Sequence, residues 1–499
     1  ENPSHKNQRR DHEKRKDKPM TIRKRISRIW IVSCILSLMI GNTAFAAPAW
    51  TDDSNVILES EAGIVMDAQS GAVIYGKNSE EQYYPASITK IMTALLVLEN
   101  CSLDETVTFS RDAVYNVESG STNAGIDEGE QMTVEDCLYA MMLKSANEAA
   151  NALAEHVSGS REAFAELMTR RAKELGCENT SFKNPSGLND PEHYTTARDF
   201  ALIVQAAWEL EEFRNIESQL SYKLPPTAND PEGLTVRQEH KMMLEDWSQY
   251  YDPDVKGGKT GYTTLAGNTL ATVAERDGRT LIVVILKGSK PDHYTTYTDT
   301  RQLLDYGFEG FTNFYPAEEE TDPASLAETI KQVGITLEEG VEPVIEEAGA
   351  ITVPAGAAFT DAAVSVSADL SEEAPEGAIA RLDYTYEGRP VGSAYVKTKQ
   401  TAVQPVPEET KAPAEEETSG QAKTALPVWM IFVAAGGLLA AAAVGLIIWF
   451  RIQQAKKEAQ ARQERIRERR RRLQESGVSM EEFDQLLKER QEKKKKEKG

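Results

Sequence analysis

The stretch AGNTLATVAERDGRTLIVVILKG, residues 266–288, contains two β-strand patterns joined by a tight turn. The first pattern ends at Arg276, and the second is an apolar run rich in Val and Ile that follows Arg279. Asp277 and Gly278 lie between the two patterns, and this dipeptide favours a two-residue hairpin because both positions tolerate positive φ. The stretch therefore predicts a strong antiparallel hairpin.

A second hairpin pattern lies near the other end of the same region. The runs GIVMDA and AVIYG flank Gln69-Ser70-Gly71 within residues 55–76. Between the two hairpins, apolar residues recur at helical spacing, and a shorter helical segment covers about 299–307. The three clearest helical stretches are ITKIMTALLVLE, VEDCLYAMMLKSANEAANALAEHV and AFAELMTRRAKELG. Strands at both ends with helices between predict one α+β domain over 47–315, a sheet of N- and C-terminal strands covered by helices.

The composition changes after this region. Residues 318–400 hold short alternating stretches such as ARLDYTYEGRPVGSAYV, in which Ala380, Leu382, Tyr384 and Tyr386 share one face before a turn at Gly388. This pattern predicts a small all-β domain. Residues 401–424 are rich in proline and glutamate and are typical of an extended stalk.

Charge is distributed unevenly along the 499 residues. The net charge is -23, yet residues 1–28 and 451–499 each carry +7, so the chain between them carries -37. An acidic body would repel phosphate backbones, which argues against a nucleic-acid-binding protein. Basic ends beside apolar runs are instead typical of segments that a membrane orients.

Two apolar runs indicate export and anchoring. Residues 29–40 follow a basic segment and precede Ala44-Phe45-Ala46, so residues 1–46 are expected to be an N-terminal extension and signal peptide. An uncleaved anchor is the alternative. Residues 425–450 contain no charge and carry Trp429 and Trp449 near their ends, which predicts a single membrane-spanning helix rather than a buried soluble one. The basic tail 451–499 would then lie in the cytoplasm and residues 47–424 outside it.

Three short motifs occur in order within the α+β region. In Ser87-Ile88-Thr89-Lys90 the lysine follows the serine by one helical turn, so the amine lies within reach of the hydroxyl. A desolvated pocket and the positive end of a helix both favour an uncharged lysine, which is the form that accepts a serine proton.

The other two motifs supply polar groups to a cleft. Ser145-Ala146-Asn147 places a hydroxyl and an amide two residues apart, suited to proton relay and to holding a substrate amide, although the serine could simply cap the following helix. Lys259-Thr260-Gly261 follows two glycines. On a strand at a cleft edge, its lysine and threonine can bind a carboxylate while glycine permits close backbone approach.

The set S-x-x-K, S-x-N and K-T-G matches that of penicillin-recognising serine enzymes. The surrounding text, including PASITKIMTALLVLE and VKGGKTGYTTLAGNTLATVAERDGRTLIVVIL, resembles low-molecular-weight penicillin-binding proteins of the D-alanyl-D-alanine carboxypeptidase family. The resemblance covers about 50–310, and more loosely the β domain. It implies a penicillin-binding, β-lactamase-like transpeptidase fold, and an enzyme that trims D-alanine from peptidoglycan stem peptides and is acylated by β-lactams.

The resemblance also implies roles for individual residues. Ser87 would be the acylated nucleophile and Lys90 its proton acceptor, and Ser145 would assist proton transfer. The proposed substrate-binding groups are Asn147, Lys259, Thr260, Gly261 and Tyr262. The backbone N–H groups of Ser87 and Tyr262 would form the oxyanion hole. Substrate contacts at Gln238-Glu239-His240 stay open, because the family has different residues there.

No cofactor or metal is expected, because protein groups supply the nucleophile, base and oxyanion donors. Cys101, Cys137 and Cys177 would remain after signal removal, and no C-x-x-C or Cys/His metal spacing appears. The expected location is a single-pass membrane protein with its catalytic domain outside the cytoplasm. His193 and His240 are predicted to be structural.

Two other functions share this motif set. A serine β-lactamase is one alternative, although no E-x-x-L-N segment follows Ser145 to activate a deacylating water. A non-enzymatic sensor of cell-wall fragments or β-lactams is the other. Intact motif residues make it less favoured.

Overall fold

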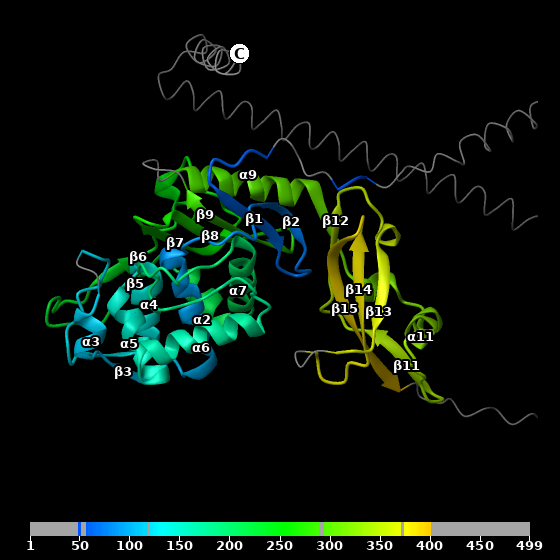
Figure 1. The fold of residues 1–499 in the computed structure, drawn as a ribbon, viewed down its shortest axis with the longest axis horizontal. Coiled ribbons are helices and arrows are strands. Elements are labelled where there is room, and N and C mark those ends of the chain that lie inside the picture. The colour runs from blue at the N-terminus through cyan, green and yellow to red at the C-terminus, as the bar shows by residue number, and fades with distance from the viewer. Residues whose placement is uncertain (1–47, 51–55, 118–119, 289–293, 371–373, 401–499) are drawn as a thin grey trace, which may run out of the picture. The chain divides into compact units, whose positions relative to one another are not determined.

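A computed structural model describes residues 48–50, 56–117, 120–288, 294–370 and 374–400 (Figure 1). The expected signal peptide, stalk, membrane span and cytoplasmic tail lie outside these residues. No helix within the described ranges is both long and apolar enough to cross a bilayer.

The described chain begins with two strands, continues through a run of helices, and returns to strands. The strands of the first part are β1 (Ala62–Asp67), β2 (Val73–Lys77), β3 (Thr106–Thr108), β4 (Gln131–Thr133), β5 (Ser221–Lys223), β6 (Thr235–Arg237), β7 (Val255–Thr263), β8 (Gly267–Arg276) and β9 (Arg279–Gly288). Its helices are α2 (Lys90–Asn100), α3 (Arg111–Tyr115), α4 (Val134–Lys144), α5 (Asn147–Ser158), α6 (Arg161–Glu174), α7 (Ala197–Glu209), α8 (Glu211–Glu217) and α9 (Thr295–Gly310), with 3-10 turns at Ala86–Thr89, Lys241–Met243 and Glu245–Trp247.

One five-stranded sheet joins the two ends of this part, in the order β2-β1-β9-β8-β7. All neighbours pair antiparallel, and β1 from the N-terminal hairpin lies against β9 from the C-terminal one. Asp277 and Gly278 have φ values of 51° and 80°, so the β8–β9 turn has the positive dihedrals that its dipeptide favours. Both predicted hairpins and the α+β arrangement are confirmed.

The two faces of the sheet pack against different helices. On β9, Ile282, Val284 and Leu286 belong to the core shared with α2 and α4 to α8, whereas Val283 and Ile285 belong to the core on the side of α9. This alternation follows from the two-residue period of a strand buried on both faces.

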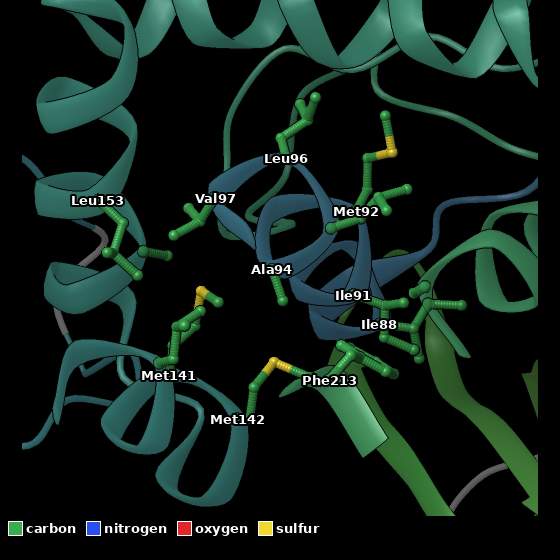
Figure 2. Packing of buried hydrophobic residues seen from close by; sticks show 14 of the residues in the cluster. Ile88, Ile91, Met92, Ala94, Leu96, Val97, Met141, Met142, Leu153 and Phe213 are labelled. Atoms are coloured by element: carbon green, nitrogen blue, oxygen red, sulfur yellow. The ribbon is translucent and has the colours of Figure 1, made fainter. Parts of the chain in front are cut away.

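Helix α2 lies within the first core. Every residue from its first to Val97 is buried, and Figure 2 shows its side chains meeting Met141 of α4, Leu153 of α5 and Phe213 of α8. A helix apolar on all sides is expected in such a place. Its N-terminus is therefore held rigidly by the surrounding helices.

A second, six-stranded antiparallel sheet follows. Its strands are β10 (Phe311–Phe314), β11 (Val341–Ile345), β12 (Ala350–Pro354), β13 (Ala363–Ser367), β14 (Ala380–Tyr386) and β15 (Arg389–Gln400). The order is β10-β12-β15-β14-β13, and β11 also pairs with β15. The inward-facing residues of β14 are the predicted Ala380, Leu382, Tyr384 and Tyr386.

This part differs from the expected all-β domain in two respects. The sheet already includes Phe311–Phe314, because α9 ends at Gly310 and the chain continues directly into β10. It also contains two short helices, α10 (Pro316–Glu319) and α11 (Pro323–Lys331). The side chain of Asp322 caps α11 and Pro323 occupies its first turn, which is a helix-start signal.

Candidate active site

Ser87 and Lys90 meet at the start of α2. Ser87 lies in the 3-10 turn Ala86–Thr89, which continues directly into α2 at Lys90. One turn separates the two residues, and Nζ of Lys90 lies 3.1 Å from Oγ of Ser87, within hydrogen-bond distance. The amine is thus placed to exchange a proton with the hydroxyl.

Lys90 is fully buried and held by two acceptors. Its Nζ donates to Oδ1 of Asn147 and to the carbonyl of Ser186, both at 2.7 Å. Burial lowers the pKa of Lys90 well below its usual value, and the positive charge of Lys259 lowers it further. The shift is toward the neutral amine, whose lone pair accepts a proton.

Ser145 and Asn147 come from the junction of α4 and α5. Ser145 ends α4 in the left-handed conformation at φ 59°, and Asn147 begins α5 with its backbone N–H bonded to the carbonyl of Thr122. This break turns the chain so that Ser145 lines the same cleft as Ser87. The amide oxygen of Asn147, which was expected to hold substrate, is bonded to Lys90 in this structure.

The Lys259-Thr260-Gly261 motif lies on β7, at the edge of the sheet and beside the Ser87 turn. A Cβ atom added to Gly261 would lie 2.9 Å from the backbone nitrogen of Ser87 and 2.3 Å from Oγ1 of Thr269. Only glycine permits this approach between the strand and the turn. Thr260, Gly261 and Tyr262 all line the cleft.

Lys259 is buried behind the cleft. Its Nζ lies 4.0 Å from the carboxylate of Glu239 and donates to the carbonyl of Thr260. Burial lowers the pKa of Lys259, whereas Glu239 and the buried Glu217 oppose that shift. An anionic substrate group would replace the weak contact with Glu239 by a direct one.

Glu217, at the end of α8, was not among the predicted site residues. Its Oε2 accepts a hydrogen bond of 2.8 Å from the N–H of Gly258, next to Lys259. Burial raises the pKa of Glu217 to about 7, although the Gly258 N–H and Lys259 act in the opposite direction. No sequence motif marks this carboxylate, because it reaches β7 from 41 residues away.

The cleft has a volume of about 510 Å³. It combines the motif residues with a wall formed by the segment 238–247 and by α9, which the sequence had left open. Lys241 lies over the ring of Trp247 at 4.1 Å in this wall. The lining residues that the sequence analysis had not assigned are Thr122, Gln238, Glu239, Lys241, Leu244, Trp247, Asn268, Thr269, Leu270, Thr296 and Tyr297.

Both predicted structural histidines are buried and hydrogen-bonded. Nε2 of His240 bonds Oγ1 of Thr272 at 2.8 Å, and Nε2 of His193 bonds Oγ1 of Thr89 at 3.0 Å. Burial lowers the pKa of His240 to about 3 and that of His193 to about 4, so both rings are neutral near pH 7. Their place is beside the motif residues rather than in the cleft lining.

Comparison with known proteins relates this geometry to one family. The family model for D-alanyl-D-alanine carboxypeptidase matches residues 49–290. D-alanyl-D-alanine carboxypeptidase DacF of Bacillus subtilis is 34% identical over 280 residues, which are 55% of this chain and 68% of the relative. DacC of Escherichia coli, of the same description, is 33% identical over 323 residues, which are 63% of this chain and 76% of the relative.

A solved structure extends the similarity beyond the motif region. Penicillin binding protein 5 from Haemophilus influenzae aligns at 25% identity with a TM-score of 0.54. The alignment covers 70% of this chain and 99% of that protein. The penicillin-binding-protein-like α+β fold expected from the sequence is therefore found in the structure.

Proposed function

Because this chain belongs to the D-alanyl-D-alanine carboxypeptidase family of penicillin-binding serine hydrolases, we propose that it removes the terminal D-alanine from peptidoglycan stem peptides through an acyl-enzyme on Ser87. The observation that carries the proposal is the hydrogen-bond contact of 3.1 Å between the buried amine of Lys90 and the Ser87 hydroxyl. Penicillins, whose strained amide resembles the D-alanyl-D-alanine amide, would acylate the same oxygen.

Acylation begins with proton transfer. Neutral Lys90 takes the proton of Ser87 as Oγ attacks the carbonyl carbon between the two D-alanines. The N–H groups of Ser87 and Tyr262 stabilise the oxyanion, a role supported by the close approach of Gly261 to the Ser87 nitrogen. The proton then passes to the leaving amine, with Ser145 as relay, and free D-alanine departs.

Substrate placement follows from the other side of the cleft. Lys259 attracts the terminal carboxylate and the Thr260 hydroxyl hydrogen-bonds it, while Asn147 and the backbone of Gly261 align the peptide. Water then attacks the acyl carbon while Lys90 accepts its proton, and Lys90 returns that proton to Oγ of Ser87 as the ester bond breaks. All groups needed for this cycle are protein groups.

The site is proposed to face the cell wall. The apolar run 425–450 and the basic tail 451–499 favour a single membrane anchor with a cytoplasmic C-terminus. The Pro/Glu-rich segment 401–424 would hold the catalytic part away from the bilayer.

The test is D-alanine release from a peptide ending in Lys-D-Ala-D-Ala by the full-length chain in detergent. We expect release by the wild type and by Ser325→Ala, which removes an exposed hydroxyl on α11, and none by Ser87→Ala. Release that persists in Ser87→Ala would refute the nucleophile. A folded wild type that releases nothing would refute the activity, and the lifetime of its penicillin adduct would then separate a β-lactamase from a sensor.

A further inference from the structure

Three metal-ligating side chains meet at the far end of the helices that carry the active site. They are Cys101, Glu105 and His156, whose Sγ, carboxylate oxygen and imidazole nitrogen all lie within 4.8 Å of one another. Cys101 follows the last residue of α2, Glu105 precedes β3, and His156 lies in the last turn of α5. The linear sequence hides this cluster, because 51 residues separate Glu105 from His156.

Helix packing explains why these groups converge. Val97 of α2 and Leu153 of α5 point toward each other within the core (Figure 2). Residues three or four positions apart on a helix lie on the same face, so His156 follows Leu153 along the shared edge. Cys101, directly after α2, donates its backbone N–H to the carbonyl of Val97 and so lies next to that residue. The same packing that buries the two helices therefore brings the thiol and the imidazole to one corner.

Glu105 is already oriented toward this corner. Its Oε2 lies 3.0 Å from Nε2 of His156, and its Oε1 accepts a hydrogen bond from the N–H of Ser102. A carboxylate held in this way has one oxygen committed to the backbone and the other facing the imidazole. The arrangement resembles the outer-sphere support that orients metal-binding carboxylates.

An ordinary surface ion pair would account for Glu105 and His156 but not for the thiol beside them. Cys101 is half-buried and forms no disulfide with another cysteine of the described ranges. A thiolate, an imidazole and a carboxylate are the donors that Zn²⁺ prefers, at about 2.0 to 2.3 Å each, so modest side-chain rotations would close three donors around one ion. Two negative charges from the thiolate and carboxylate also balance the charge of a divalent ion.

We propose that Cys101, Glu105 and His156 form a Zn²⁺ site with three protein ligands and a fourth position open to water. The site joins the C-terminal ends of α2 and α5 to the turn before β3. Lys90 begins α2 and Asn147 begins α5, so the ion lies about 16 Å along α2 from the active-site end. Its effect is on the stability of this helix pair and not on the acyl-transfer chemistry.

Cobalt provides a direct test, because a bound thiolate gives a charge-transfer band and tetrahedral geometry gives intense visible bands. The full-length chain is freed of metal with a chelator and titrated with Co²⁺ and then Zn²⁺. We expect a thiolate–cobalt band that Zn²⁺ abolishes, that is absent in Cys101→Ser, and whose Co²⁺ affinity falls roughly tenfold or more in His156→Ala and Glu105→Gln.

Asp104→Asn is the matched control, because it removes an exposed carboxylate in the same turn that is not part of the cluster. It should bind Co²⁺ as the wild type does. Covalent labelling of each variant by a fluorescent penicillin verifies that the fold is intact. A wild type that shows no band, or a band that survives in a folded Cys101→Ser variant, would overturn the proposal.

Thermal unfolding gives an independent readout. Zinc at about 100 times its dissociation constant should raise the melting temperature of the wild type by about 4 °C. The Cys101→Ser chain should show no such rise. An equal rise in both chains would place the stabilising ion elsewhere and contradict the assignment.

Discussion

The amide oxygen of Asn147 lies 2.7 Å from Nζ of Lys90, so the first residue of α5 holds the amine at the start of α2. Both residues are buried, and the contact therefore acts without screening by solvent. The neutral amide accepts this hydrogen bond without adding a negative charge. It thus keeps Lys90 in place while burial favours the uncharged amine.

Asn147→Asp should favour the charged form of Lys90 instead of the neutral amine. A carboxylate at the same position favours the protonated form of Lys90, and an opposite charge this close raises a lysine pKa by roughly one unit or more. Acylation needs the neutral amine and is lost as pH falls through the pKa of Lys90. The acidic limb of the penicillin acylation profile should therefore move to higher pH by about one unit.

Asn147→Ala supplies the control, because it removes the hydrogen bond without adding charge. It should lower the acylation rate with little movement of the acidic limb. If the acidic limb of the acylation profile lies at the same pH in Asn147→Asp and Asn147→Ala, Lys90 is not the group that limits acylation at low pH.

Gly261→Ala should block acylation while leaving the chain folded. Its new Cβ would lie 2.9 Å from the backbone nitrogen of Ser87 and 2.3 Å from Oγ1 of Thr269, so β7 must move away from the nucleophile turn. A displaced oxyanion donor costs roughly a hundredfold in rate or more. The rate of covalent labelling by a fluorescent penicillin measures the loss.

Adding Thr269→Ala to Gly261→Ala separates the two contacts. The second substitution removes the hydroxyl at 2.3 Å together with its hydrogen bond to the carbonyl of Pro85, and Thr269→Ala alone measures the effect of losing that bond. We expect labelling to stay slow in the double variant. Recovery to the rate of Thr269→Ala alone would show that the side-chain contact, and not the backbone approach, requires glycine.

Glu217→Gln should change how stability depends on pH. The carboxyl of Glu217 has a pKa of about 7 when folded, against 4.5 as the ordinary value, so between these pH values the unfolded chain ionises while the folded chain stays protonated. The contribution of this carboxyl to the free energy of unfolding is fully present below pH 4.5 and is lost as pH rises through 7. The expected loss is roughly 3 kcal/mol.

Glutamine keeps an oxygen for the Gly258 N–H but cannot ionise. The free energy of unfolding of Glu217→Gln, measured in urea, should therefore rise relative to that of the wild type as the pH increases from 4 to 8. Parallel pH curves for the two chains would show that Glu217 does not titrate there.

The parts of the fold and site that the sequence predicted depend on residues that are close together in the chain. The Ser87 and Lys90 pair needs one helical turn, and the β8–β9 hairpin needs only Asp277-Gly278 between two strand patterns. A single sheet built from N- and C-terminal strands was also predicted, because strand patterns occurred at both ends of one helical region.

Features that depend on distant packing were not predictable in this way. Glu217 reaches the backbone of β7 from α8, and Lys241 and Trp247 form a wall of the cleft from short 3-10 turns that carry no periodic pattern. The corner shared by Cys101 and His156 depends on how α2 packs on α5. Strand β10 lies before the expected boundary at 318, because the chain passes directly from Gly310 at the end of α9 into a strand whose partner β12 is about 40 residues further on.

A polar network joins the two sheets. The carboxylate of Asp67, at the end of β1, accepts hydrogen bonds from Nη2 of Arg279 at 3.3 Å and from Nδ2 of Asn313 at 3.0 Å. Arg279 also donates to the carbonyl of Phe311 at 2.8 Å, so β9 is tied to β10. Asp67 is fully buried, and this pair is therefore hardly screened by water.

Asp67→Ala should destabilise the folded chain by about 3 to 5 kcal/mol, because it leaves the guanidinium of Arg279 buried without its anion. Lys331→Ala removes an exposed ion pair with Glu328 and should cost less than about 1 kcal/mol. In the double variant Asp67→Ala/Arg279→Ala no charge is stranded, so the combined loss measured by urea unfolding should be smaller than the sum of the two single losses. The Oδ1 atom of Asp67 also accepts hydrogen bonds from the backbone N–H groups of Gln69 and Ser70. Additive losses would mean that Asp67 stabilises the fold through these bonds and that the ion pair itself contributes little to joining the sheets.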